Sequence, residues 1–153
     1  MNNEELKNKI SIFLSSAEFS EEGSQYLNVT VTPEHLFSLA EFLRNDEDLS
    51  FDYLFCLTGV DWITHFLVIY HLDSVKYKHT IVLKAKITDR ENPAVKTVSF
   101  IWKTAEFHER EVYDLFGIKF PEHPDLRRLL LDEDWVGYPL RKDYTDKANI
   151  VEL

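Results

Sequence analysis

Cysteine is the scarcest informative residue in this 153-residue sequence, and its scarcity excludes two kinds of site. A single cysteine, Cys56, can form no intrachain disulfide, and it cannot by itself hold an iron–sulfur cluster. Because Cys56 lies within an apolar run, we expect a buried, unreactive thiol. Gly117 and Gly137 stand alone rather than in a glycine-rich loop, so the sequence contains no nucleotide-binding motif.

Long hydrophobic runs are also absent. No stretch approaches the roughly twenty apolar residues that a membrane-spanning helix needs. The first twenty residues contain three glutamates and no arginine, unlike a secretory signal or a transit peptide. We therefore expect a cytoplasmic bacterial protein that reaches a membrane only through its partners.

Basic residues are too few for a nucleic-acid-binding surface, because the formal net charge is -10. Acidic residues outnumber basic ones by ten to three in residues 1–50 and by twelve to seven in residues 105–153. Residues 51–104 instead hold five acids and seven bases. A mildly basic middle between acidic ends favours complementary protein partners.

The first half of the chain reads as alternating helices and strands. Residues 3–16 and 33–45 have apolar residues at helical spacing, and Thr32 followed by Pro33 marks the start of the second helix. Residues 26–31 alternate like a strand, and residues 51–60, the most apolar run, are predicted to form the central strand. This order predicts a right-handed crossover between parallel neighbouring strands.

The next elements complete one domain. Residues 66–72 and 80–87 are predicted to pair as a hairpin, residues 95–102 to be extended, and residues 104–117 to form a helix with a threonine N-cap and a glycine stop. The predicted fold is a two-layer α+β domain over residues 1–116, with one mixed sheet and helices packed on one face. An extended C-terminal segment, residues 117–153, belongs to the same domain.

The helix at 104–117 carries an apolar stripe beside a charged one. Arg110 and Asp114 stand at the spacing of a helical ion pair, which is either a solvated surface pair or part of a buried interface. A cluster of acids and histidines also raises the alternative of a free-standing metal or acid–base enzyme. The spacing argues against a metal, because Glu109 and Glu111 point about 200° apart around a helix and His108 has Val112 one turn later. The cluster comprises His108, Glu109, Glu111, Asp114 and His123.

The C-terminal segment combines prolines, arginines and large apolar residues. Prolines at 121, 124 and 139 prevent long regular structure, while the apolar side chains are too many to stay solvated. Aromatics and arginines in such a segment are typical of a binding surface. The alternative is that the segment only closes over its own core.

The order of these residues resembles one family, the 30 kDa or C-type subunit of proton-pumping NADH:quinone oxidoreductase, which is respiratory complex I. Matching motifs keep their order and spacing over about forty residues, and the family domain covers nearly the whole chain. The motifs are Glu109-Arg110-Glu111, Tyr113 to Ile118, Phe120, His123-Pro124, Asp125 to Leu130, Trp135, Gly137 and Pro139 to Tyr144.

This resemblance implies a structural subunit without catalysis or cofactor of its own. It would dock against the 49 kDa-type (D-type) subunit and the iron–sulfur subunits of the peripheral arm, on the cytoplasmic face of the bacterial inner membrane. FMN and iron–sulfur clusters, NADH and quinone would then belong to its partners. The alternative machine is a membrane-bound hydrogenase or ferredoxin-driven complex with an equivalent subunit. The implied partner-binding residues are Glu109, Arg110, Glu111, Asp114, Phe116, His123, Pro124, Leu126, Arg127, Arg128, Trp135, Pro139, Leu140, Arg141, Lys142 and Asp143.

Overall fold

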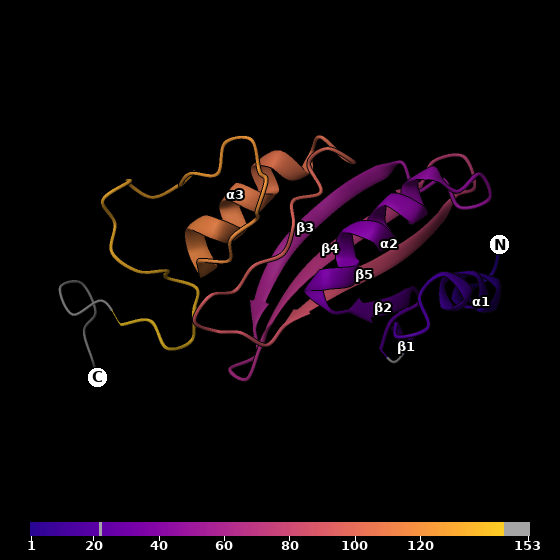
Figure 1. Cartoon of the computed structure of the whole chain (residues 1–153), viewed down its shortest axis with the longest axis horizontal. Coiled ribbons are helices and arrows are strands. Elements are labelled where there is room, and N and C mark those ends of the chain that lie inside the picture. Colours follow the sequence, from indigo (N-terminus) through magenta and orange to yellow (C-terminus); the bar gives the residue numbers. More distant parts are fainter. Residues whose placement is uncertain (22, 146–153) are drawn as a thin grey trace.

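The computed structural model describes residues 1–21 and 23–145, which form one mixed sheet with helices (Figure 1). The strands in sheet order are β1-β2-β5-β4-β3, and within the described residues there are five of them and three helices. All pairings are antiparallel except that of β2 with β5. The bounds are α1 Asn3–Phe13, β1 Glu18–Ser20, β2 Leu27–Val31, α2 Pro33–Asn45, β3 Tyr53–Asp61, β4 Phe66–Ser74, β5 His79–Ile87 and α3 Ala105–Phe116.

One face of the sheet is buried beneath the helices, as predicted for a two-layer α+β domain. Strand β4 alternates strictly, with Phe66, Val68, Tyr70 and Leu72 fully inside and the residues between them partly exposed. Helix α2 lies across this face and buries Leu36, Leu39, Ala40 and Leu43, while α3 packs against β3 (Figure 1). The side chains that recur at every second position of β4 and at helical spacing in α2 therefore pack together in one core.

Local patterns predicted several elements correctly. Helix α2 and the β4–β5 hairpin form as predicted, and Pro33 occupies the first turn after the cap residue Thr32. Helix α1 ends at Phe13, three residues earlier than the pattern suggested. Its start is fixed by a capping box, in which the Asn2 side chain accepts from the Glu5 amide and the Glu5 carboxylate accepts from the Asn2 amide.

The predicted central position of residues 51–60 is wrong, because β3 lies at one edge of the sheet. The parallel neighbour of β2 is β5 instead, so the predicted crossover does not join adjacent strands. High apolarity does not require a central position here, since nearby side chains cover the open edge. Trp102 Nε1 donates to the Phe51 carbonyl at 2.9 Å, and Thr104 Oγ1 donates to the Leu54 carbonyl at 3.0 Å.

Several smaller points also need correction. Strand β1 was too short to be recognised from its sequence. The predicted extended stretch at 95–102 is only partly so: the Val95 and Thr97 amides donate to the Lys119 and Pro121 carbonyls at 3.0 and 3.1 Å, but residues 99–101 form a turn. Thr104 does not cap α3 with its side chain, because its hydroxyl is used on β3. Cys56 is half-buried on the face of the sheet that the helices do not cover, and its cross-strand neighbour on β4 is His71.

Candidate functional site

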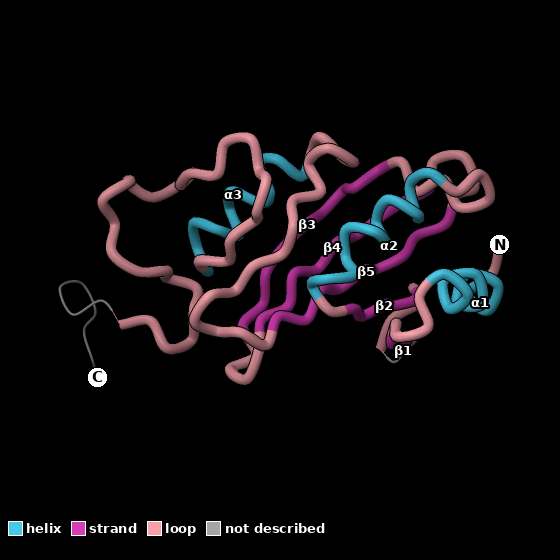
Figure 2. Tube along the Cα trace, viewed as in Figure 1, coloured by secondary structure: helices cyan, strands magenta, loops and turns pink. Residues whose placement is uncertain are grey.

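Helix α3 is buried on two sides. Ala105, Glu109, Val112 and Phe116 recur at helical spacing and lie inside the domain. Arg110 and Asp114, one turn apart, are also buried, but they lie beneath the C-terminal segment. Figure 2 shows that the described part of this segment, residues 117–145, is loop and curls around α3, while residues 146–153 of the predicted segment lie outside the described residues. The predicted charged stripe therefore holds the segment, while Glu111 on the same stripe is exposed.

Asp114 is the centre of this arrangement. Its Oδ2 accepts the amides of Leu129, Leu130 and Leu131 at 3.2, 2.7 and 3.0 Å, and its Oδ1 accepts Arg128 Nη1 at 3.0 Å. Burial alone would raise the pKa of Asp114, but these donors together lower it below its ordinary value. The predicted Arg110–Asp114 ion pair is wrong, since the cation beside Asp114 is Arg128.

Two arginines secure the backbone of the segment from inside. Arg128 Nη2 donates to the carbonyls of Trp135 and Gly137 at 3.0 and 2.8 Å. Arg110 donates through Nε and Nη2 to the carbonyls of Arg127 and Arg128 at 3.2 and 3.1 Å. Their guanidinium groups supply donors to residues 127–137, a stretch of the loop that is neither helix nor strand. Neither head group is therefore free for an outside carboxylate.

The end of α3 is closed by an aromatic and an arginine. Gly117 has φ +74°, and an added Cβ would lie 2.6 Å from the Tyr138 ring and 2.8 Å from Arg141 Nη2. Arg141 Nε donates to the Phe116 carbonyl, and its guanidinium stacks on Tyr138 and on the buried Phe66 ring, 5.1 Å from each centroid. The glycine stop predicted from the sequence is thus also a point of close approach.

Asp61, at the end of β3, attaches the segment to the sheet. Arg90 donates to both of its carboxylate oxygens at 2.6 and 3.1 Å, and the Lys142 amide donates to Oδ2 at 2.9 Å. The Arg90 guanidinium, together with backbone amide donors, holds the pKa of Asp61 well below its ordinary value. Nothing in the local sequence pattern marks Asp61, because these partners lie 29 and 81 residues away.

Glu109 is fully buried and does not face the segment. Its carboxylate accepts the Thr97 hydroxyl, at 2.6 Å to Oε2, and the Val98 amide at 2.9 Å. Burial nevertheless raises its pKa to about 7, against the opposing effect of these hydrogen bonds. Tyr70 nearby in the core has a buried hydroxyl without a hydrogen-bond partner among the described residues.

The acids and histidines do not converge on one point. His123 Nε2 lies 2.9 Å from the Glu106 carbonyl, and its Nδ1 accepts the Asp125 amide at 2.9 Å, so both ring nitrogens are used in a turn. Within residues 1–21 and 23–145, no group of three or more histidines, cysteines or acids is placed to hold a metal ion. In the same part of the chain, no helix is long and apolar enough to cross a bilayer.

The segment exposes several apolar side chains among its charged ones. Leu130 is 66% exposed and Val136 88%, with Leu129 and Leu140 also open to solvent. Trp135 is partly buried, and its buried indole N–H has no partner among the described residues. The remaining predicted partner-binding residues divide by exposure: Pro124, Arg127, Lys142 and Asp143 are exposed, Leu126 and Pro139 are intermediate, and Phe116 is buried.

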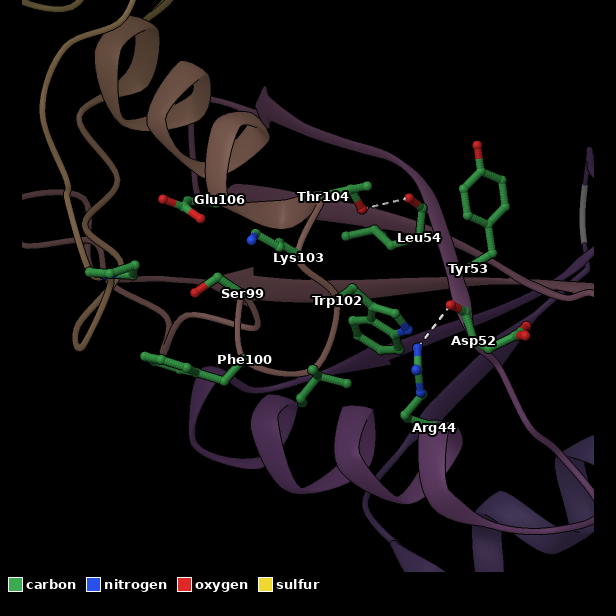
Figure 3. A pocket seen from close by; sticks show the side chains of 12 residues that line it. Arg44, Asp52, Tyr53, Leu54, Ser99, Phe100, Trp102, Lys103, Thr104 and Glu106 are labelled. Atoms are coloured by element: carbon green, nitrogen blue, oxygen red, sulfur yellow. Dashed lines mark hydrogen bonds between the residues drawn. The ribbon is translucent and has the colours of Figure 1, made fainter.

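A separate cleft of about 560 Å³ lies at the start of α3 (Figure 3). Its walls come from α2, the start of β3 and the turn before α3, with exposed Phe100 at one side. Arg44 is already used, since its Nη1 donates to the Asp52 carbonyl at 2.8 Å. The charged residues at this cleft balance each other and comprise Arg44, Lys103, Asp52 and Glu106.

The fold and the site define an α+β domain with one mixed sheet and a long non-regular C-terminal segment beside α3. Buried arginines and carboxylates fix this segment in place. Comparison with known proteins assigns this class of domain to a family. The model of the family described as "Respiratory-chain NADH dehydrogenase, 30 Kd subunit" matches residues 29–149, and the chain belongs to this family.

Relatives of this chain have complex I names. It is 44% identical over 133 residues to the C-type subunit of the NADH-quinone oxidoreductase of Roseiflexus castenholzii, covering 85% of this chain and 74% of that one. It is 51% identical over 114 residues to the C/D-type subunit of the enzyme of the same name from Phocaeicola vulgatus, covering 74% of this chain but only 22% of that larger protein. The resemblance noted from the motifs is confirmed.

One solved structure comes from a different complex. The chain superposes with a TM-score of 0.76 on a chain of a membrane-bound sulfane sulfur reductase, described as an archaeal respiratory membrane complex. The two are 28% identical, and the match covers 95% of this chain and 86% of the other. The same fold thus occurs in a membrane complex named for another activity.

Proposed function

We propose that this chain is a structural subunit of NADH:quinone oxidoreductase that docks through its C-terminal segment onto the 49 kDa-type (D-type) partner and the iron–sulfur subunits. The observation that carries the proposal is the segment itself, which is fixed from inside by Asp114, Arg110 and Arg128 while it turns Leu130 and Val136 outward. A rigid loop with apolar side chains outside has surface to bury against another protein.

The chemistry of the complex then belongs to the partners. Electrons would pass from NADH through FMN and iron–sulfur centres to quinone, coupled to proton translocation, without a group held by this chain. The peripheral position, on the cytoplasmic face of the bacterial inner membrane, follows from contact with those partners. The C/D-type relatives support the D-type partner as the neighbour, because one protein carries both designations.

Affinity purification of the tagged full chain from detergent-solubilised membranes tests this function. We expect the D-type, iron–sulfur and FMN-bearing subunits to copurify. Recovery of the chain alone, or catalytic turnover by the chain alone, would contradict the proposal. Arg127→Glu, which reverses an exposed charge on the segment beside Asp125, should weaken this recovery without unfolding the domain.

A second candidate function is the equivalent subunit of another membrane complex, and the likeness to the sulfane sulfur reductase chain favours it. The two candidates share the docking role and differ in the machine. The same purification separates them, because an FMN-bearing NADH subunit would copurify in one case and a hydrogenase- or sulfur-reducing-type metal subunit in the other.

A further inference from the structure

The turn between β3 and β4 holds two large apolar side chains in solvent at one end of the sheet. Trp62 is 55% exposed and Ile63 is 64% exposed, and they are adjacent in the chain. Aliphatic and aromatic residues of this size usually bury most of their surface. A neighbouring tryptophan and isoleucine outside the core are therefore candidates for the energetic centre of a protein contact.

The backbone of this turn is strained. The Thr64 amide donates to the Trp62 carbonyl at 2.9 Å, which closes a three-residue γ-turn, and Ile63 at its apex has φ +73°. A β-branched residue rarely adopts this conformation, and γ-turns with positive φ are strained. Such strain persists only where the surroundings impose it, and it concentrates at functional positions. The outward placement of Ile63 is thus held by the rest of the fold.

Asp61 imposes that placement. Its Oδ1 accepts the Ile63 amide at 2.7 Å, while its Oδ2 accepts the Lys142 amide at 2.9 Å. Arg90 fixes the same carboxylate, which is almost fully buried. Because one carboxylate binds both backbones, the turn and the C-terminal segment are held in a fixed relation. Leu140, two residues before Lys142, is half exposed on the segment side.

We propose that Trp62, Ile63 and Leu140 form one docking surface for the D-type subunit. The inference rests on the proposed function and extends its interface from the segment to the β3–β4 turn. The occupant is the D-type subunit, because Asp61 joins the turn to the docking segment and the C/D-type relatives combine this family with the D-type subunit in one protein. A surface built from two parts of the chain also explains why the strained turn is tied to a residue 81 positions away.

Cross-linking in the intact complex tests which protein lies on the turn. A photoreactive phenylalanine derivative is introduced in place of Ile63 in the tagged full chain, and separately in place of Val75. Val75 is the matched control, because it is 62% exposed on the turn at the opposite end of β4. We expect irradiation to join position 63, but not position 75, to the D-type subunit.

A binding measurement supplies a second readout. Ile63→Gly removes the side chain and relieves the positive φ, so the variant should keep or raise its melting temperature. It should bind the purified D-type subunit about thirty-fold more weakly, the change expected when a contact of about 2 kcal/mol is lost. Val75→Ser should bind as the parent does.

Three outcomes count against the inference. Cross-linking of position 63 to another protein, or to nothing, overturns it while leaving the proposed function intact if the parent chain copurifies with the D-type subunit. Equal affinity of Ile63→Gly and the parent also overturns it. If the parent chain recovers no D-type subunit at all, the proposed function itself has failed, and the inference fails with it.

Discussion

Glu109 carries a carboxyl group whose ionisation opposes folding. Its pKa of about 7 in the folded chain exceeds the ordinary value of 4.5, so between these pH values the folded chain holds a proton that the unfolded chain has lost. The free energy of unfolding contributed by this group therefore falls as pH rises from 4.5 to about 7 and is then constant. Over that interval the loss is about 3 kcal/mol, at about 1.4 kcal/mol per pKa unit.

The corresponding prediction concerns Glu109→Gln, which keeps the shape and removes the titration. Chemical denaturation at pH 5 and pH 8 should show that the stability of the variant relative to the parent improves at the higher pH by about 2 to 3 kcal/mol. The relative measure matters because Asp61 and Asp114, with lowered pKa values, stabilise the fold above their ordinary titration range and lose this effect in acid. A constant difference between variant and parent would contradict the pKa assigned to Glu109.

Gly117 offers a test of close packing at the same scale. Gly117→Ala should cost about 2 to 4 kcal/mol, because alanine adds both the strain of φ +74° and an overlap with Tyr138. Gly23→Ala is the matched control, since φ is +72° there but nothing lies within 4 Å of the added Cβ. It should cost only about 1 kcal/mol. Equal losses in thermal or chemical denaturation would mean that the Tyr138 contact is unimportant.

At the scale of elements, the C-terminal segment depends on α3. Arg128→Ala removes donors from the carbonyls of Asp114, Trp135 and Gly137, so we expect the loop after Arg128 to open while the sheet stays folded. Limited chymotrypsin digestion should then cut at Leu129–Leu131 or Trp135 much faster than in the parent. Arg127→Ala is the control, because the side chain of this exposed neighbour pairs with Asp125 within the same loop. Equal digestion of the two variants would refute the anchoring role of Arg128.

Local periodicity predicted the elements whose contacts lie within a few residues of each other in the sequence. Helix α2, the β4–β5 hairpin and the glycine stop of α3 follow from spacing over a few residues. The order of strands does not, since β2 finds its parallel neighbour in β5 about fifty residues later. Strand β3 was misplaced because its apolar residues serve both the core and an edge covered by Trp102 and Thr104.

The candidate site was predicted in composition but not in contacts. The sequence identified Arg110, Asp114 and Arg128, yet their partners are mostly backbone groups 7 to 18 residues away across a loop, which no local spacing rule indicates. The burial of Glu109 had a visible signal, because it lies on the stripe of Ala105, Val112 and Phe116. The exposed pair Trp62 and Ile63 had none, since an apolar residue in a turn gives no indication of its exposure. The partner-binding role of the segment stays a prediction.

At the scale of the whole molecule, the exposed apolar side chains of the C-terminal segment should contribute to assembly rather than to the stability of the domain. Leu130→Ser with Val136→Ser should reduce recovery of the D-type subunit at least tenfold while shifting the melting temperature by less than about 2 °C. Ile12→Ser is the control: this residue is 87% exposed on α1, outside the residues matched by the family model. Normal recovery of the double variant would show that these side chains contribute little to assembly.

The link between Asp61 and the Lys142 amide also has a consequence for biosynthesis. The carboxylate is synthesised early, but the amide that completes its contacts follows 81 residues later. A ribosome that stops before Lys142 would release a chain with all five described strands but without this closing contact. Because the proposed docking surface depends on this contact, prematurely terminated chains should be incorporated into the complex less well than chains that include Lys142.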